Sequence, residues 1–321
     1  MRRAAVAILA SAVLPHSVAV AQTFPVKPVR YVVPFGAGTS PDIVGRLIAD
    51  KLSRIWGQQV IVDNRVGAAG TMGTNFVAKS PPDGHTLIQC NIASSAIAVS
   101  LFVKMPYDQL RDVAAVTRIG TTPNIVTTHP STPFRSMKDL IAYAKRNPGK
   151  LSYTSGLVGT SPQLSFELVK LIAKIDIVNI PYKNGAQGIT DTIGGQVPIN
   201  ISNFPQSVAP VQSGRLRPLA VTTAQRAATF PEVPTMQEAG LAGYEVSSWQ
   251  GVCAPGGTPP AVLEKINADV NGVLRMTDVH ARLEELMMGG PETTREQFDQ
   301  FIRGEISRWA RVIKEAGIPQ Q

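Results

Sequence analysis

One pattern, a short strand followed by a glycine-rich turn and a helix, occurs twice in this chain and constrains its fold more than any other feature. In the first copy, residues 29–35 are β-branched and aromatic, residues 36–39 are rich in glycine, and residues 43–55 place apolar side chains on one helical face. Gly57 ends that helix, and residues 60–62 supply the next strand. We therefore expect a βαβ unit with parallel strands and a right-handed crossover.

The second copy has the same order and shares a tetrapeptide with the first. The sequence GTSP occupies residues 38–41 and again residues 159–162, the second time between strands expected at 150–154 and 177–182. In each copy we expect the serine, Ser40 or Ser161, to be the helix N-cap and the following proline to be the first helical residue. The pattern predicts two similar α/β domains.

The remaining segments fit the same plan. We expect further strands at 86–90, 197–201, 216–221 and 246–253, one extended crossing segment within 116–128, and closing helices at 259–274 and 294–316. The predicted organisation is a signal peptide at 1–21, a first domain beginning with 22–124, a second domain at 125–225, and a return to the first domain at 226–321. Two segments that cross between two domains make a hinge, and the hinge makes a cleft.

The first 21 residues have the order of a secretory signal peptide. Arg2 and Arg3 precede an apolar run at 4–14, and residues 19–21 read Ala-Val-Ala, so we expect cleavage after Ala21 and export. Without these two arginines the formal net charge of +8 becomes +6. The remaining basic residues are scattered, which argues against a nucleic-acid partner.

The two cysteines, Cys90 and Cys253, each lie in an apolar, strand-like run. A disulfide between them would suit an oxidising compartment, but cysteine spacing does not decide the question. We expect buried free thiols.

The glycine-rich turns are the candidates for ligand binding. A helix N-terminus has unpaired N–H groups and a partial positive charge, and a preceding glycine-rich turn lets an anion approach them. Two such turns that face each other across a cleft would clamp one carboxylate. Asp42, in the first helical turn, either stabilises the helix dipole or acts in the site by repelling a second negative charge or accepting from an amine or water.

Enzymatic motifs are weak. Residues 36–41 approach the dinucleotide fingerprint GxGxxG, but Pro41 replaces the last glycine and Asp63 lies beyond the usual spacing of about 20 residues. HExxH, CxxC and GxSxG do not occur, and His85, His129 and His280 are isolated. The sequence predicts no catalytic residue, cofactor or metal, and an enzyme on the same scaffold, dinucleotide-dependent or hydrolytic, is the alternative.

Several stretches, taken in order, resemble a known family. They are FPVKPVR at 24–30, VPF at 33–35, VDNR at 62–65, PDGHTL at 82–87, PYK at 181–183, GGQV at 194–197, FPEVPT at 230–235 and WQGV at 249–252. They make the chain similar, from about residue 24 to its C-terminus, to the Bug family of solute-binding receptors of tripartite tricarboxylate transporters.

The resemblance implies a type II periplasmic binding protein fold. In this venus-flytrap arrangement two α/β domains, each a mixed sheet flanked by helices, are joined by two crossing strands. It also implies a periplasmic location, a small carboxylate ligand and membrane transporter subunits as partners. We expect a monomer, because the protein must close around its ligand. A ligand-sensing role in a signalling system is a further alternative.

The expected ligand-binding residues come from the two turns and from the resemblance. They are Phe35, Gly36, Ala37, Gly38, Thr39, Ser40, Asp42, Ser155, Gly156, Val158, Gly159, Thr160, Ser161, Tyr182, Lys183, Ser202 and Asn203. The chain departs from the family pattern at Thr39, Gln163, Asn184 and Ser202, where the family commonly has glycine, histidine, glycine and aspartate. Losing the histidine and the aspartate removes charge, so we assume neither a typical dicarboxylate nor citrate as the ligand.

Overall fold

The computed structural model describes residues 24–315 and 317–320. The predicted signal peptide and its cleavage site lie outside these residues. The strands are β1 (Val29–Val33), β2 (Val60–Asn64), β3 (Thr86–Asn91), β4 (Val113–Thr128), β5 (Ser152–Thr154), β6 (Val178–Ile180), β7 (Ile199–Asn203), β8 (Arg217–Val221) and β9 (Ser247–Pro255).

The helices alternate with the strands. They are α1 (Ser40–Trp56), α2 (Thr71–Ala78), α3 (Ala98–Leu101), α4 (Gln109–Asp112), α5 (Met137–Arg146), α6 (Ser161–Ala173), α7 (Gly185–Ile193), α8 (Phe204–Gln212), α9 (Pro260–Leu274), α10 (Thr277–Glu285) and α11 (Arg295–Glu315), with short helical turns η1 (Ala68–Gly70) and η2 (Ala93–Ile97). Within the described part of the chain, no helix has the length and apolar character needed to cross a membrane.

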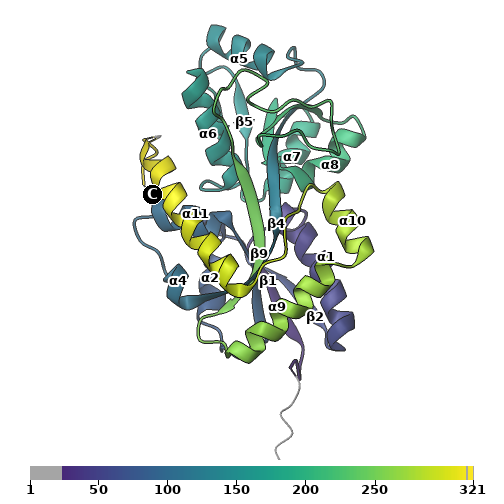
Figure 1. The fold of residues 1–321 in the computed structure, drawn as a ribbon. Helices are drawn as coiled ribbons and strands as arrows, with labels where there is room; N and C mark the ends of the chain where they lie inside the picture. The colour runs from purple at the N-terminus through teal and green to yellow at the C-terminus, as the bar shows by residue number, and fades with distance from the viewer. Residues whose placement is uncertain (1–23, 316, 321) are drawn as a thin grey trace, which may run out of the picture.

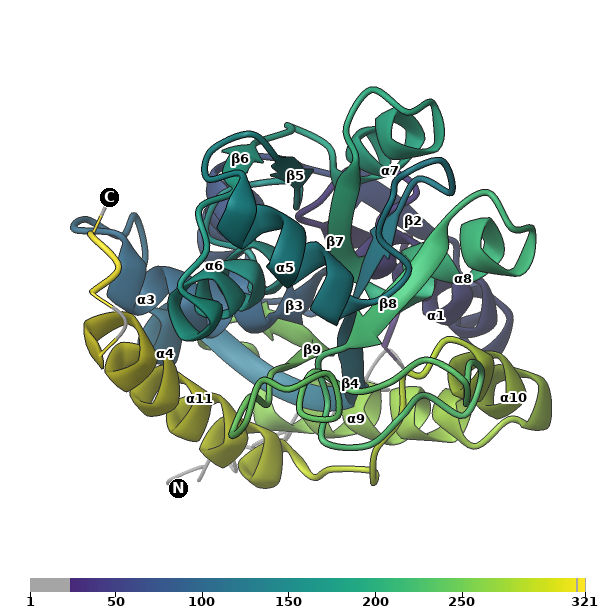
Figure 2. The same cartoon turned by 90° about the horizontal axis from the view of Figure 1, so that it is seen from above.

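The strands form a mixed, nine-stranded arrangement in the order β2-β1-β3-β9-β4-β7-β5-β6, with β8 also paired to β4. Strand β1 is parallel to β2 and β3, and β5 is parallel to β6 and β7, as predicted for the two βαβ units. Strands β4 and β9 are antiparallel to each other. The fold is therefore mixed α/β with helices on both faces of the sheet (Figure 2).

Strand β4 connects two groups of strands. Its residues 113–123 pair with β9, and from Asn124 onward it pairs with β7 and, one residue later, also with β8. Figure 1 shows β4 and β9 running between a lower group with β1, β2, α1 and α9 and an upper group with β5 to α8. The expectation of one extended segment within 116–128 is confirmed.

Apolar side chains bury both faces of the sheet. On β1, Tyr31 and Val33 belong to the core cluster that includes Val44 and Ile48 of α1, whereas Val32 belongs to a second cluster on the other face. All three β1 side chains are fully buried. A strand that is buried on both faces reads as a continuous apolar run, which is how this strand appears in the sequence.

The prediction of free thiols is wrong, because Cys90 and Cys253 form a disulfide. Strands β3 and β9 are antiparallel neighbours, with Cys90 opposite Gly251 and Cys253 opposite Ile88. This register brings the two cysteine Cα atoms to 5.7 Å, within the range that a disulfide requires. The sequence could not reveal this pairing, since it depends on β9 inserting between β3 and β4.

Candidate functional site

The two glycine-rich turns adopt one backbone geometry. Gly38 and Gly159 both have positive φ, 77° and 81°, which favours glycine at these positions. The N–H of Gly38 donates to Asp42 Oδ2 at 3.0 Å, and the N–H of Gly159 donates to Gln163 Oε1 at 3.2 Å. In each copy, therefore, the side chain four residues later fixes the turn.

The threonines of the two tetrapeptides are also equivalent. Thr39 Oγ1 donates to the carbonyl of Gly36 at 2.6 Å, and Thr160 Oγ1 donates to the carbonyl of Leu157 at 2.7 Å. Each threonine has extended backbone angles and is the N-cap residue of its helix. The repeated letters thus encode the same local structure twice.

The prediction that Ser40 and Ser161 are the N-caps is wrong by one residue. Both serines are the first helical residue, which places each proline second. The Ser40 hydroxyl instead accepts a hydrogen bond at 2.7 Å from Nε2 of Gln250, which lies on β9. Ser161 Oγ accepts from Asn203 Nδ2 at 3.4 Å.

Asp42 supports the first turn from behind. Its buried carboxylate accepts hydrogen bonds from Gly38 N–H, Asn64 Nδ2 and Arg46 Nε at 2.9–3.0 Å. Burial opposes ionisation of this carboxyl, but the hydrogen bonds from Arg46, Asn64 and Gly38 outweigh that effect and hold its pKa below the ordinary value. These contacts give Asp42 a structural role in the turn.

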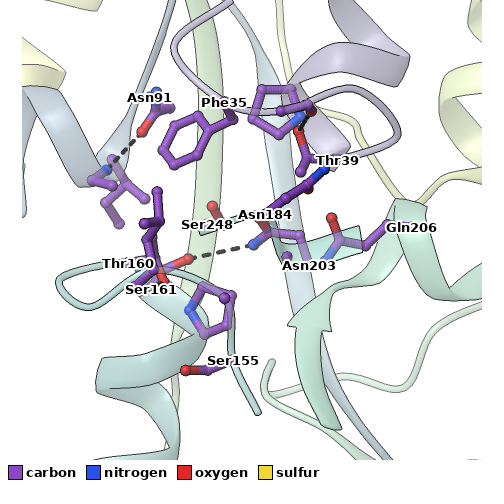
Figure 3. Close-up of a pocket in the computed structure, with 18 of the residues that line it drawn as sticks. Phe35, Thr39, Asn91, Ser155, Thr160, Ser161, Asn184, Asn203, Gln206 and Ser248 are labelled. Atoms are coloured by element: carbon purple, nitrogen blue, oxygen red, sulfur yellow. Dashed lines mark hydrogen bonds between the residues drawn. The ribbon is translucent and has the colours of Figure 1, made fainter. Parts of the chain in front are cut away.

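A cavity lies between the two turns (Figure 3). It holds about 550 Å³ of space not filled by protein atoms, part of it open to solvent. The lining residues are Phe35, Gly36, Thr39, Pro41, Asn91, Ile92, Ala93, Ser155, Gly156, Leu157, Thr160, Ser161, Pro162, Lys183, Asn184, Gly185, Asn203, Gln206, Ser248 and Gln250. Figure 3 shows Phe35 and Thr39 on one side and Thr160, Ser161 and Ser155 on the other.

The structure brings together part of the predicted site. The predicted residues that line the cavity are Phe35, Gly36, Thr39, Ser155, Gly156, Thr160, Ser161, Lys183 and Asn203. The predicted residues outside its lining are Ala37, Gly38, Ser40, Asp42, Val158, Gly159, Tyr182 and Ser202. Several of the latter hold the turns in shape, as Gly38, Asp42 and Gly159 do.

The expected ligand-binding residues did not include other lining residues, among them Asn91, Gln206, Ser248 and Gln250, nor Asn184, which the sequence marked only as a departure from the family pattern. Asn91 ends β3, so the rule that ligands bind at the carboxyl ends of parallel strands could have found it. Ser248 and Gln250 lie on β9, close to the predicted crossing point. Nothing in the sequence indicated Gln206, which lies in the first turn of α8.

A buried chain of hydrogen bonds fixes the cavity wall on the β9 side. The Tyr31 hydroxyl donates to Gln89 Oε1, Gln89 Nε2 donates to Gln250 Oε1 at 2.7 Å, and Gln250 Nε2 donates to Ser40 Oγ. All four side chains are at most 1% exposed. Each side chain in this wall therefore has a protein partner without a ligand.

The N-termini of α1 and α6 differ in one respect. The N–H of Ser40 donates to Gln206 Oε1 at 3.0 Å, so a side chain of α8 already occupies the N-terminus of α1. Among the hydrogen bonds of the described residues, none uses the N–H of Thr160 or Ser161 at the start of α6. Of the two helix N-termini, that of α6 is therefore the one with open backbone donors.

The cavity has an unbalanced charge. Of the residues in its lining, all of which the structure describes, Lys183 alone is ionisable at neutral pH. Lys183 is exposed at the start of the loop that leads into α7. One cation, two helix N-termini and no carboxylate give the cavity a positive potential, which suits an anion.

Comparison with known proteins gives a consistent result. The family model for the tripartite tricarboxylate transporter family receptor matches residues 44–318. The protein BugT of Bordetella pertussis is 36% identical over 298 residues, which cover 92% of this chain and 91% of BugT. These matches extend across nearly the whole described chain.

Solved structures are similar over the same extent. The structure of Rhodopseudomonas palustris Rpa4515 with adipate has 36% sequence identity and a TM-score of 0.89, and the match covers 92% of this chain and 99% of that one. The periplasmic binding protein BugD has 29% identity and a TM-score of 0.89, with 93% of this chain and all of BugD covered. The fold described above is therefore that of the Bug periplasmic binding proteins.

Proposed function

The chain belongs to the tripartite tricarboxylate transporter receptor family, and from this premise we propose that it captures a small carboxylate in the cavity between its two glycine-rich turns. The family consists of receptors, so the chain binds its solute and does not transform it. The observation that carries the proposal is a cavity at two helix N-termini whose one ionisable lining residue is a cation. The adipate in the Rpa4515 structure supports a carboxylate ligand.

The ligand carboxylate would bind at the start of α6. The free N–H groups of Thr160 and Ser161 are the donors there, and the Ser155 hydroxyl lies in the same wall. Lys183 would stand over the other end of the ligand. Phe35 and Leu157 supply apolar surface for a carbon chain.

Binding would be coupled to closure of two domains. In this proposal the two strand groups are the domains, and they pivot where β4 changes partners at Asn124 and where β9 begins at Ser247. The closed form would deliver the solute to the membrane subunits of a tripartite transporter. The receptor would act in the periplasm as a monomer, after a signal peptide ending at Ala21 has been removed, so N-terminal sequencing of the exported protein should begin at Gln22.

A thermal-shift screen of the purified protein tests the function. The probes are adipate, succinate, malate, citrate and benzoate, each paired with its uncharged amide as a control for the carboxylate. A ligand at 100 times its dissociation constant should stabilise the fold by about 2.7 kcal/mol, which raises the melting temperature measurably. Stabilisation by an acid and not by its amide supports the proposal. Stabilisation by neutral solutes or nucleotides alone would refute it.

A further inference from the structure

Two amide side chains in the cavity, those of Asn184 and Gln206, indicate which class of acids it binds. We propose, on the basis of the proposed function, that Asn184 and Gln206 make this receptor selective for acids whose second end accepts hydrogen bonds. Together with Lys183, these residues exclude acids that carry an ammonium group. The selected class is that of dicarboxylates, keto acids and hydroxy acids. The excluded class is that of amino acids with the same carbon skeleton.

The orientation of both amides is fixed by backbone donors. Asn184 Oδ1 accepts from the N–H of Ala186 at 3.1 Å and caps α7, and Gln206 Oε1 accepts from the N–H of Ser40 at 3.0 Å. A backbone N–H can only donate, so the oxygen of each amide must face it. The NH₂ group of each side chain is therefore the part left for other partners.

Those two NH₂ groups belong to the cavity. Both residues line it, and no hydrogen bond within the described chain uses Asn184 Nδ2 or Gln206 Nε2. The Asn184 side chain lies directly against the first turn, since a Cβ placed on Gly36 would come within 2.7 Å of Asn184 Cγ. Figure 3 shows Asn184 and Gln206 between the two turns. With Lys183 next in sequence, three side-chain donor groups lie in neighbouring parts of the lining.

The lining of the same cavity, all of it described by the structure, contains no carboxylate that could pair with an ammonium group. The oxygens of Asn91 and Gln250 already accept hydrogen bonds from the protein, which leaves Asn203 Oδ1 as the unpaired amide oxygen of the lining. The Asp42 carboxylate lies outside the lining. An ammonium group would thus lose its hydration shell beside Lys183 without meeting an opposite charge, and an unpaired buried charge is strongly unfavourable.

Matched pairs of acids test this inference by isothermal titration calorimetry at pH 7. The probes are succinate against aspartate, glutarate against glutamate, and adipate against 2-aminoadipate, each titrated into the full chain. In the pair whose diacid binds most tightly, the dissociation constant of the amino acid is expected to be at least tenfold higher than that of the diacid. A tenfold change is about what the loss of one charged contact causes. If an amino acid binds with an affinity within tenfold of that of its diacid, the proposed selectivity is wrong, while the receptor function still holds. If no acid of any kind binds, the proposed function fails and this inference falls with it.

Two variants assign the selectivity to its residues. Gln206→Glu and Asn184→Asp each keep the oxygen that accepts the backbone N–H and replace the NH₂ donor with a second oxygen that carries charge. Each is expected to weaken diacid binding at least tenfold and to bring the amino acid closer to the diacid. The matched control is Gln187→Glu, an exposed position on α7 outside the lining, which adds the same charge nearby.

The comparison among variants decides the assignment. Both site variants should unfold cooperatively near the wild-type temperature, since the capping oxygens are retained. If neither variant narrows the ratio of diacid to amino acid affinity beyond what Gln187→Glu does, Asn184 and Gln206 do not determine specificity.

Discussion

At the residue scale, the two turns reach one geometry through different supporting side chains. Asp42 holds Gly38 with a carboxylate that also pairs with Arg46, while Gln163 holds Gly159 with a neutral amide. Hydrogen bonds to an ionised group are stronger than those between neutral groups. The first turn is therefore the more firmly fixed of the two, and its stability depends on the ionisation of one carboxyl.

The variant Asp42→Asn tests that dependence. At pH 7 it should lower the free energy of unfolding by about 1–2 kcal/mol, because hydrogen bonds to a charged acceptor are lost. The pKa of Asp42 is lower in the folded protein than the ordinary value of about 3.9, so its contribution is present above that value and is lost as the pH falls through the folded pKa. Urea unfolding at neutral and acid pH should show that the difference in unfolding free energy between the wild type and Asp42→Asn becomes smaller toward low pH.

The exposed helical pair of Asp50 and Arg54 offers a matched control for this experiment. Asp50→Asn removes a similar charge from the same helix and should change stability by less than about 0.5 kcal/mol. If the difference in unfolding free energy between the wild type and Asp42→Asn does not change with pH, the charge of Asp42 does not support the turn.

Lys183 gives a second prediction at this scale. Lys183→Ala should weaken binding of a diacid about tenfold and a monoacid less, since only the diacid has a second charge to pair with the ammonium group. Titration calorimetry of both ligands against the variant and against Lys145→Ala, an exposed lysine on α5, makes the comparison. Equal losses for both ligands would place Lys183 away from the second end of the ligand.

The sequence could predict the residues whose role follows from local structure. Phe35, Thr39, Ser155 and Thr160 lie in turns between a strand and a helix, where a ligand site is expected, and all four line the cavity. Gln206 could not be found in this way. It reaches the cavity because α8 packs beside α1, a contact between segments far apart in the sequence.

At the scale of elements, the two βαβ units were predictable because their apolar periodicity and glycine-rich turns agree. Helices α7 and α8 were not predicted, and their composition explains why. Helix α7 begins with Gly185 and contains Gly188, and α8 contains Pro210 inside it. These residues disfavour an isolated helix, so packing against the sheet must stabilise both.

The disulfide between β3 and β9 gives a prediction for these elements. Replacing Cys90 and Cys253 together with alanine should lower the free energy of unfolding by about 2–5 kcal/mol, because the bond constrains the unfolded chain across a separation of 163 residues. Ligand affinity should not change, since neither cysteine lines the cavity. Reductant should destabilise the wild type to the same degree and leave the double variant unaffected. If reductant destabilises the double variant as well as the wild type, its effect does not come from breaking this disulfide, and the stabilising role of the disulfide is not supported.

At the scale of the whole molecule, the proposed closure of two domains assigns the described form to the closed state, because its contacts cross the cavity. Gly36 lies against Asn184, and Ser40 bonds to Gln206, so the first turn touches α7 and α8 of the other strand group. Two strands, β4 and β9, carry the chain between the groups. Opening would break these polar contacts and bend the strands where β4 changes partners.

Distance measurements between spin labels test this closure. Labels at Met72→Cys on α2 and Lys138→Cys on α5, both exposed, report on the two strand groups. Without ligand the distance distribution should be broad, and a saturating diacid should narrow and shorten it. A control pair within one group, Met72→Cys with Arg54→Cys, should not respond. Identical distributions with and without a bound diacid would contradict the hinge.

The disulfide also changes what a break in the backbone would do to this molecule. Cys90 and Cys253 close the chain into a lariat whose loop contains all of β5 to β8 and the long irregular stretch between β8 and β9. A single proteolytic cut anywhere in that loop leaves the two pieces covalently joined. The nicked protein would run at full mass on a gel without reductant and separate into two fragments only when the disulfide is reduced.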